Sequence, residues 1–223
     1  MGIFDFNFNF GNKQTSIKEL DSSELEDAKF KARIAIIDDE EVPNIDNLLN
    51  DGYNVIKYSD LENVDEFIRK KHNVLILDIQ GVGEKIAGKR GGWGILDYLK
   101  KEYPHLVIII FTGADWSITK YKEVADMADF IIGKDAEYLD FKMKLDAAIR
   151  RSFSFKFHLE VFTKEIEKTN KDQQKIIELI NKYGKDKSKT LKKIRKVTTN
   201  EFTLQKVDNL LSIISSIYSI IPS

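Results

Sequence analysis

Between residues 33 and 150, short apolar runs alternate with segments of helical periodicity. Five of these runs have the length and the β-branched content of buried strands: residues 33–37, 54–58, 73–77, 106–111 and 129–132. The helical segments lie near 43–50, at 62–71, 93–102 and 117–126, and from about 137 onward. This alternation predicts an α/β fold, in which helices cover both faces of a five-stranded, doubly wound parallel sheet.

After residue 150 the strand-like runs end and the pattern is helical. The charge changes at the same place. Residues 1–150 carry 20 Lys and Arg against 28 Asp and Glu, a net charge of −8, whereas residues 151–223 carry 15 against 8, a net charge of +7. We therefore divide the chain into an N-terminal arm with a short helix (1–32), an α/β domain (33–150) and an all-α C-terminal appendage (151–223).

The last helix of this appendage is predicted to begin at Thr198–Glu201, which has the spacing of a capping box. Its apolar positions step by three and four, as in a helix-packing seam: Leu204, Val207, Leu211, Ile214, Tyr218 and Ile221. A helix this apolar has to bury most of its surface. We expect it to pack both in a small bundle with residues 153–180 and against a second copy of the chain.

A basic run precedes that helix. It holds eight cationic residues against a single acid, Asp186: Lys182, Lys185, Lys187, Lys189, Lys192, Lys193, Arg195 and Lys196. Such a run is usually a solvated helix face. The alternative is binding to nucleic acid, through the phosphate backbone because the run is poor in aromatic residues.

The N-terminal arm has Phe4, Phe6, Phe8 and Phe10 at strict alternation. In an extended conformation these rings share one face. The arm is then either a strand that docks on a sheet edge of a partner or a segment that packs on its own domain. An amphipathic helix is predicted to follow at residues 16–30.

The amino-acid composition excludes several kinds of functional site. The chain has no Cys and three His, which excludes disulfides, thiolate nucleophiles and zinc sites built on thiolates. No run approaches the roughly 20 apolar residues of a membrane span, and the first residues lack the basic region of a secretory signal. We expect a cytoplasmic protein with no membrane partner.

Polar residues follow four of the predicted strands. Asp38 and Asp39 follow the first, Asp78 the third, Thr112 the fourth and Lys134 the fifth. Because ligands of open α/β sheets bind beyond the carboxyl ends of the strands, these side chains should converge. Three carboxylates at one point repel one another unless a divalent cation neutralises them, and oxygen ligands suit Mg²⁺.

Four strand-end motifs resemble those of the response-regulator receiver domain of two-component signalling, in the same order: Ile36–Glu40, Leu75–Asp78, Phe111–Gly113 and Ile132–Lys134. The resemblance covers residues 33–150 and implies the chemotaxis-type, flavodoxin-like receiver fold. Residues 151–223 resemble no family that we recognise.

The resemblance also implies a role for each site residue. Asp78 would be the phosphoacceptor, Asp39 a direct Mg²⁺ ligand and Asp38 a ligand through the water shell of the metal. The backbone carbonyl of Gln80 would complete the set of protein ligands. Thr112 would hydrogen-bond the new phosphoryl group, and Lys134 would pair with it.

The sequence departs from the receiver pattern at several points. The stretch Gln80–Gly94 is longer than usual and rich in glycine, and it is either a mobile loop, which we favour, or a phosphate cradle beside Asp78. Trp93 within it is interpreted as a core anchor, with an exposed partner contact as the alternative. Asp135 stands where the family usually has proline, Ile131 stands where it usually has an aromatic residue, and the first helix is short.

The predicted function is that of a phosphorylation-controlled response regulator. A cognate histidine kinase or phosphotransfer protein would supply the phosphate, and the C-terminal helices would act through homodimerisation or a partner protein. The chain would be no enzyme beyond its own phosphorylation and dephosphorylation. Two alternatives are a DNA- or RNA-binding regulator that uses residues 182–196, and a receiver that only drains a kinase of phosphate.

Overall fold

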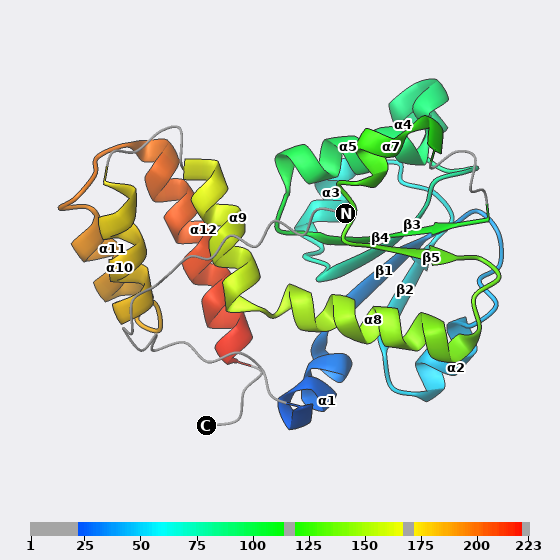
Figure 1. The fold of residues 1–223 in the computed structure, drawn as a ribbon, viewed down its shortest axis with the longest axis horizontal. Helices are drawn as coiled ribbons and strands as arrows, with labels where there is room; N and C mark the ends of the chain where they lie inside the picture. Colours follow the sequence, from blue (N-terminus) through cyan, green and yellow to red (C-terminus); the bar gives the residue numbers. More distant parts are fainter. Residues whose placement is uncertain (1–21, 114–118, 167–171, 220–223) are drawn as a thin grey trace.

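A five-stranded sheet forms the centre of the α/β part of this computed structural model, which describes residues 22–113, 119–166 and 172–219 (Figure 1). All of its strands are parallel, in the order β2-β1-β3-β4-β5. The strands are β1 Arg33–Ile37, β2 Asn54–Tyr58, β3 Val74–Asp78, β4 Val107–Thr112 and β5 Phe130–Gly133. Each lies within one residue of its predicted bounds, and the predicted α/β class is confirmed.

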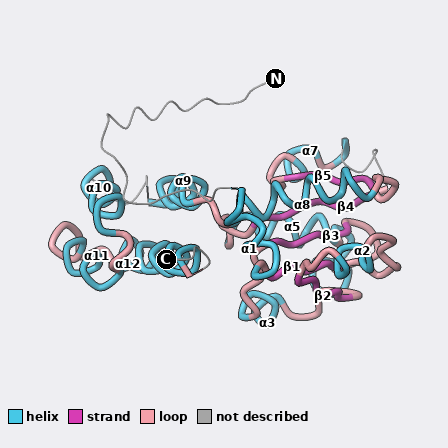
Figure 2. Tube along the Cα trace, turned by 90° about the horizontal axis from the view of Figure 1, so that it is seen from below, coloured by secondary structure: helices cyan, strands magenta, loops and turns pink. Residues whose placement is uncertain are grey.

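Helices cover both faces of the sheet, as Figure 2 shows from below. Because side chains alternate along a strand, Ile34 and Ile36 of β1 enter one core, and Ala35 and Ile37 enter the other. The first core lies under α1 (Ser22–Lys31), α2 (Ile45–Asn50) and α8 (Tyr138–Ser152). The second lies under α3 (Val64–Arg69), α5 (Gly92–Glu102) and α7 (Lys122–Ala125).

The helices depart from the predicted bounds more than the strands do. The helix predicted at 16–30 is α1, which is described from residue 22, and the four phenylalanines of the N-terminal arm lie outside the described residues. Of the helix predicted at 117–126, α7 covers 122–125, and residues 114–118 are again outside the described part. The helix α2 has six residues and is as short as predicted.

The C-terminal region forms a helical bundle. The helix predicted from about residue 137 is α8, which ends at Ser152 and does not extend into the bundle. A new helix, α9 (Phe155–Ile166), begins three residues later. The bundle continues with α10 (Gln173–Tyr183), α11 (Lys187–Ile194) and α12 (Glu201–Tyr218). Its core unites Phe162 of α9, Ile180 of α10, Ile194 of α11 and Leu211 of α12. The apolar face of α12 is therefore buried largely within its own chain.

The predicted capping box at the start of α12 is wrong. The helix begins at Glu201, and the side chain of Asn200 accepts a hydrogen bond from the backbone N–H of Thr203 at 2.9 Å. Thr198 lies two residues too early to cap, and its hydroxyl accepts from the N–H of Asn200 at 3.1 Å. Asn200 takes the cap because its short amide reaches the free N–H groups of the first turn.

The helix α8 connects the two parts of the molecule. It starts beside the carboxyl ends of the strands and runs back to the bundle, which lies beyond the opposite end of the sheet (Figure 1). Its 15 residues span about 22 Å at the rise of an α-helix. Within the described ranges, no helix combines the length and the apolar character needed to cross a membrane.

Candidate functional site

The acidic residues predicted to converge do so at the carboxyl edge of the sheet. Asp38 directly follows β1 and Asp78 ends the neighbouring strand β3, and both are almost fully buried, whereas Asp39 is exposed. One carboxylate oxygen of each residue lies within 4.8 Å of the others. This point is where the strand order reverses, because β2 lies on one side of β1 and β3 on the other. Open α/β sheets bind their ligands at such a switch point.

Lys134 reaches this cluster from the end of β5. Its ammonium lies 2.7 Å from Oδ2 of Asp78, 3.2 Å from Oδ2 of Asp38 and 3.3 Å from Oε2 of Glu40. Thr112 ends β4 and is buried, and its carbonyl accepts a hydrogen bond from the N–H of Lys134 at 3.0 Å. The structure thus brings together the five residues that follow the strands.

Burial and Lys134 act on the charge of Asp78 in opposite directions. Burial raises the pKa of Asp78, and the hydrogen bond from Lys134 partly offsets this effect. Burial would lower the pKa of Lys134, but its hydrogen bonds to Asp78 and Asp38 outweigh this and hold the pKa above the usual value. Lys134 therefore remains a cation beside the buried carboxylates.

The donor set fits Mg²⁺. Oδ2 of Asp38 is buried and makes no hydrogen bond among the described residues, because Lys134 is close to it but not in hydrogen-bonding geometry. The other oxygen, Oδ1, accepts from the N–H of Glu40 at 2.8 Å. A buried carboxylate oxygen without a donor, grouped with two further carboxylates, is what a hard divalent cation satisfies. The N–H of Gln80, whose carbonyl is the fourth predicted ligand, donates to Oδ1 of Asp78 at 3.0 Å.

Two further residues support the acidic pair, and sequence reasoning missed both. Lys57 of β2 donates from Nζ to the backbone carbonyl of Asp38 at 2.7 Å. Gly81 has a φ of +73°, and a Cβ at this position would lie 2.4 Å from Oδ1 of Asp39. The only sequence signals were a lysine near the end of β2 and a glycine three residues after Asp78.

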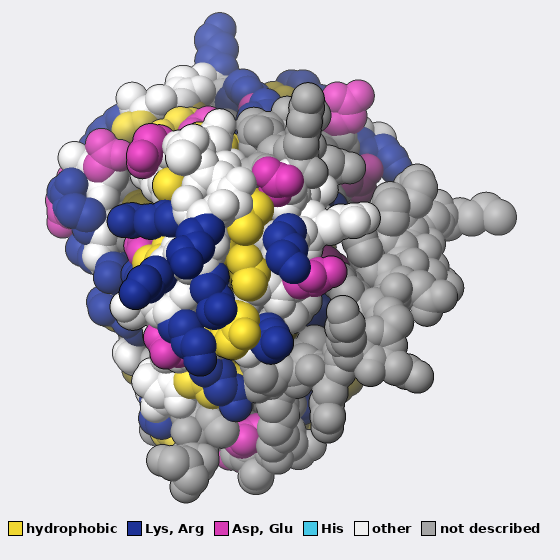
Figure 3. Space-filling view, turned by 90° about the vertical axis from the view of Figure 1, so that its left-hand side faces the viewer, with side chains coloured by type: hydrophobic (Ala, Val, Ile, Leu, Met, Phe, Trp, Pro, Cys, Tyr) yellow, Lys and Arg dark blue, Asp and Glu magenta, His cyan; other side chains and the backbone are white. Residues whose placement is uncertain are grey.

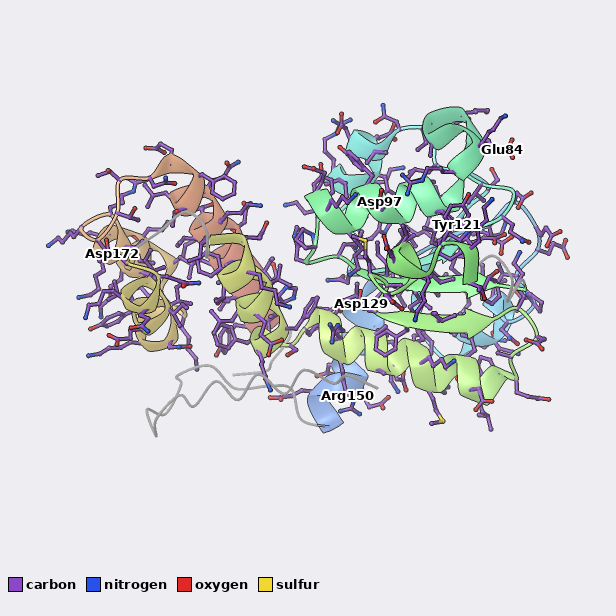
Figure 4. All side chains as sticks on the ribbon, turned by 45° about the horizontal axis from the view of Figure 1, so that its top comes forward. Glu84, Asp97, Tyr121, Asp129, Arg150 and Asp172 are labelled. Atoms are coloured by element: carbon purple, nitrogen blue, oxygen red, sulfur yellow. The ribbon has the colours of Figure 1, made fainter. Side chains whose placement is uncertain are left out.

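The glycine-rich stretch after Asp78 is largely helical. It forms α4 (Glu84–Ala87) and a 3₁₀ turn, η1 (Gly88–Arg90), which leads into α5. Lys85 lies 3.4 Å from Glu62, and Arg90 lies 3.0 Å from Asp97. Figure 4 labels Glu84 in α4 and Asp97 in α5. The stretch is thus largely helical rather than an irregular loop, and these two basic side chains pair with carboxylates.

Trp93, at the start of α5, is a core residue, as interpreted from the sequence. It is 3% exposed, and its ring stacks on Tyr121 at 5.2 Å between centroids. Ile131, in the position where receivers usually carry an aromatic residue, is 37% exposed, whereas Phe130 is half-buried against the core of the sheet.

No family model and no curated protein matches the sequence. Solved structures do match. The receiver domain of NtrX from Brucella abortus is 20% identical, with a TM-score of 0.43, and the alignment covers 52% of this chain and 97% of that one. A longer NtrX chain, in complex with ATP, is 18% identical with a TM-score of 0.45. The alignment covers 69% of this protein's chain but only 34% of the NtrX chain.

Two further matches have similar extent. A response regulator receiver domain protein from Clostridium thermocellum is 28% identical with a TM-score of 0.44, over 54% of this chain and 95% of that one. TrrA from Thermotoga maritima, in complex with Mg²⁺-BeF, is 22% identical with a TM-score of 0.43, over 52% of this chain and 98% of that one. Receiver domains are among the solved structures similar to this chain, and they match about half of its length.

Proposed function

We propose that this protein is a phosphorylation-controlled response regulator whose phosphoacceptor is Asp78. The observation that carries the proposal is the arrangement around this carboxylate. Asp78 is buried at the carboxyl end of a central strand, 2.7 Å from the ammonium of Lys134 and next to the carboxylates of Asp38 and Asp39. A structural ion pair needs only one carboxylate for Lys134, so the additional acids favour a site that binds a cation and an anionic group together.

The proposed reaction is phosphoryl transfer from a phosphohistidine of a histidine kinase or phosphotransfer protein. An oxygen of the Asp78 carboxylate forms a bond to phosphorus, the P–N bond breaks, and its electron pair returns to the imidazole, which takes up a proton. Lys134 pairs with the incoming phosphoryl oxygens, and the Thr112 hydroxyl donates a hydrogen bond to one of them. Hydrolysis of the acyl phosphate returns the carboxylate.

Mg²⁺ would be held by the carboxylates of Asp39 and Asp78, by the backbone carbonyl of Gln80 and, through its water shell, by Asp38. It supplies the charge neutralisation that lets a carboxylate approach a phosphoryl group. The support for this ligand set is the cluster of oxygens and Oδ2 of Asp38, which is buried and accepts no hydrogen bond among the described residues.

The output is proposed to pass through the helical bundle, by homodimerisation or by binding of a partner protein. The site and the bundle lie at opposite ends of α8 (Figure 1). Lys134 comes just before α8, and Arg151 near its end contacts Asp129, at the start of β5, and Phe157 of the bundle. A shift of β5 and α8 on phosphorylation would therefore reach the first helix of the bundle directly.

The test is phosphorylation by acetyl phosphate in the presence of Mg²⁺, followed by intact-mass spectrometry. We expect the wild type to gain one phosphoryl group, which alkaline treatment removes because an acyl phosphate is labile. Asp78→Asn should gain none, whereas Asp126→Asn, which alters an exposed carboxylate elsewhere, should react like the wild type. Absence of the modification in the wild type would contradict the proposal.

Light scattering on the same samples distinguishes the outputs. A change in oligomeric mass that is confined to the phosphorylated wild type supports dimerisation through the bundle. Phosphorylation without a change in mass favours a partner protein, or a receiver that only drains phosphate from a kinase.

A further inference from the structure

α10, α11 and the turns that follow each of them carry a concentration of cations, which we call the lysine surface: Lys182, Lys185, Lys189, Lys192, Lys193, Arg195 and Lys196. Figure 3 looks onto this end of the molecule and shows Lys and Arg side chains gathered across it. None of the seven lies within ion-pair distance of a carboxylate belonging to the described residues. Lys187, the remaining cation of the run, is different, because it pairs with Asp208 at 2.9 Å.

The single acid of the run does not neutralise the surface. Asp186 is the N-cap of α11, and its side chain accepts a hydrogen bond from the backbone N–H of Lys189 at 2.9 Å. Its charge is thus directed at the start of the helix rather than at the ammonium groups.

Four lysines of the lysine surface contact the rings of two tyrosines. The ammonium groups of Lys182, Lys189 and Lys193 lie 5.4, 4.8 and 4.6 Å from the centre of the Tyr183 ring. Lys185 lies 4.6 Å from the ring of Tyr218, which comes from the end of α12. Each ring attracts cations weakly through its π face. Ammonium groups drawn to one ring repel one another, and an anion placed among them relieves this repulsion.

The surface is held on a rigid support. The opposite sides of the two helices are buried in the bundle, through Ile176 and Ile180 of α10 and Ile194 of α11. The hydroxyl of the buried Thr190 donates to the carbonyl of Tyr183 at 2.6 Å and thereby fixes α11 against the end of α10. The backbone that carries the cations is therefore held in place by the bundle, so that little backbone entropy is lost when a ligand binds.

The partner that fits this surface is a polyanion such as nucleic acid rather than an anionic lipid membrane. Helices that bind anionic membranes insert large apolar side chains beside their lysines. Figure 3 shows apolar side chains between these cations, but α10 and α11 contribute none of the large exposed apolar residues of the described chain. We propose that the lysine surface binds nucleic acid through its phosphate backbone, without preference for base sequence. This activity goes beyond the response-regulator function and does not require phosphorylation of Asp78.

The test is fluorescence anisotropy with a labelled DNA duplex and its single strand, each of mixed sequence, over a series of salt concentrations. We expect the wild type to bind, with an affinity that falls steeply as salt increases, by about 0.9 log units per log unit of salt for each phosphate of the duplex contacted. The triple variant Lys182→Glu/Lys189→Glu/Lys193→Glu should bind at least about tenfold more weakly and have a salt slope smaller by about three.

The matched control is Arg69→Glu/Lys89→Glu/Lys164→Glu, which changes the net charge equally at exposed cations away from the lysine surface. It should retain most of the wild-type affinity. Circular dichroism establishes that both triple variants are folded. The proposal is overturned if the wild type does not bind at low salt, if the control loses as much affinity as the surface variant, or if vesicles with anionic lipid bind and the oligonucleotides do not.

Discussion

Arg151, the penultimate residue of α8, donates from Nε to Oδ1 of Asp129 at 2.7 Å. Asp129 precedes β5 and lies, with Arg150, at the end of the sheet that faces the bundle (Figure 4). Its carboxylate is 3% exposed, and its Oδ2 also accepts from the ammonium of Lys100 at 2.5 Å and from the N–H of Ile108 at 2.8 Å. The guanidinium of Arg151 lies 4.3 Å from the ring of Phe157. One buried carboxylate thus joins α5, β4, β5 and the approach to the bundle.

The first prediction concerns this carboxylate. Asp129→Ala leaves the ammonium of Lys100 buried without its anion, and burial already lowers the pKa of that lysine. We expect the free energy of unfolding in urea to fall by about 3–5 kcal/mol, the usual cost of breaking a buried pair. Asp126→Ala is the control, since Asp126 lies 3.9 Å from Lys122 and both are exposed; it should change stability by less than about 0.5 kcal/mol. Equal effects would contradict the prediction.

A second prediction addresses Gly81. Gly81→Ala forces an alanine to adopt a φ of +73° and places its Cβ 2.4 Å from the carboxylate of Asp39. We expect a loss of stability of about 1–2 kcal/mol from the backbone alone and weaker Mg²⁺ binding, because Asp39 must move. Thermal unfolding with and without Mg²⁺ measures both effects.

Gly88→Ala provides the matched control for Gly81→Ala. Gly88 also has a positive φ, of +58°, but a Cβ there meets nothing within 4 Å. This variant should show the backbone cost and retain the stabilisation by Mg²⁺. If both variants respond to Mg²⁺ like the wild type, contact between position 81 and Asp39 does not matter for the site.

The third prediction is stabilisation by Mg²⁺ itself. A ligand that binds only the folded state stabilises it by about 2.7 kcal/mol at one hundred times its Kd. Asp39→Ala should abolish the response with little loss of fold, since Asp39 is exposed, while Asp46→Ala, at another exposed carboxylate on α2, should keep it. A variant lacking Asp39 that is still stabilised by Mg²⁺ would exclude this residue as a ligand.

Stability should also fall in mild acid because of His158. Burial lowers the pKa of this histidine to about 4, despite a hydrogen bond between Nε2 and the carbonyl of Ser152 at 2.8 Å. In the unfolded chain the ordinary pKa is about 6.5, so the unfolded state binds the proton first. The resulting loss of stability is absent above pH 6.5 and grows as the pH falls toward 4, where it reaches about 3 kcal/mol.

Urea unfolding at several pH values between 4 and 7 measures the effect of His158. His158→Gln keeps a side-chain N–H that can donate to Ser152 but has no proton to take up. Its stability should depend less steeply on pH than that of the wild type. Parallel pH profiles for the two proteins would show that His158 is not the group responsible.

Much of the α/β part could be predicted because its signals are local. Runs such as Val74–Leu77 and Val107–Phe111 are β-branched and apolar on both faces, so they predict buried parallel strands whatever their partners. Once the strands are parallel, the residues that follow them must meet at one edge, which is why Asp38, Asp78 and Lys134 could be placed together. The helix ends were harder to predict, as the cap at Asn200 shows, because adjacent polar residues compete for the same N–H groups.

The sequence by itself determined the class of fold, the five strands and the set of polar residues at their carboxyl ends, because hydrophobic period and chain direction are properties of neighbouring residues. Only the tertiary structure decided which distant residues act on that set: Lys57 on the carbonyl of Asp38, and Gly81 beside the carboxylate of Asp39. It also decided that the ring of Tyr218 contacts Lys185, in the basic run that ends more than twenty residues earlier. Such contacts depend on how helices and strands pack, and side-chain packing is set by the whole core and not by any local pattern.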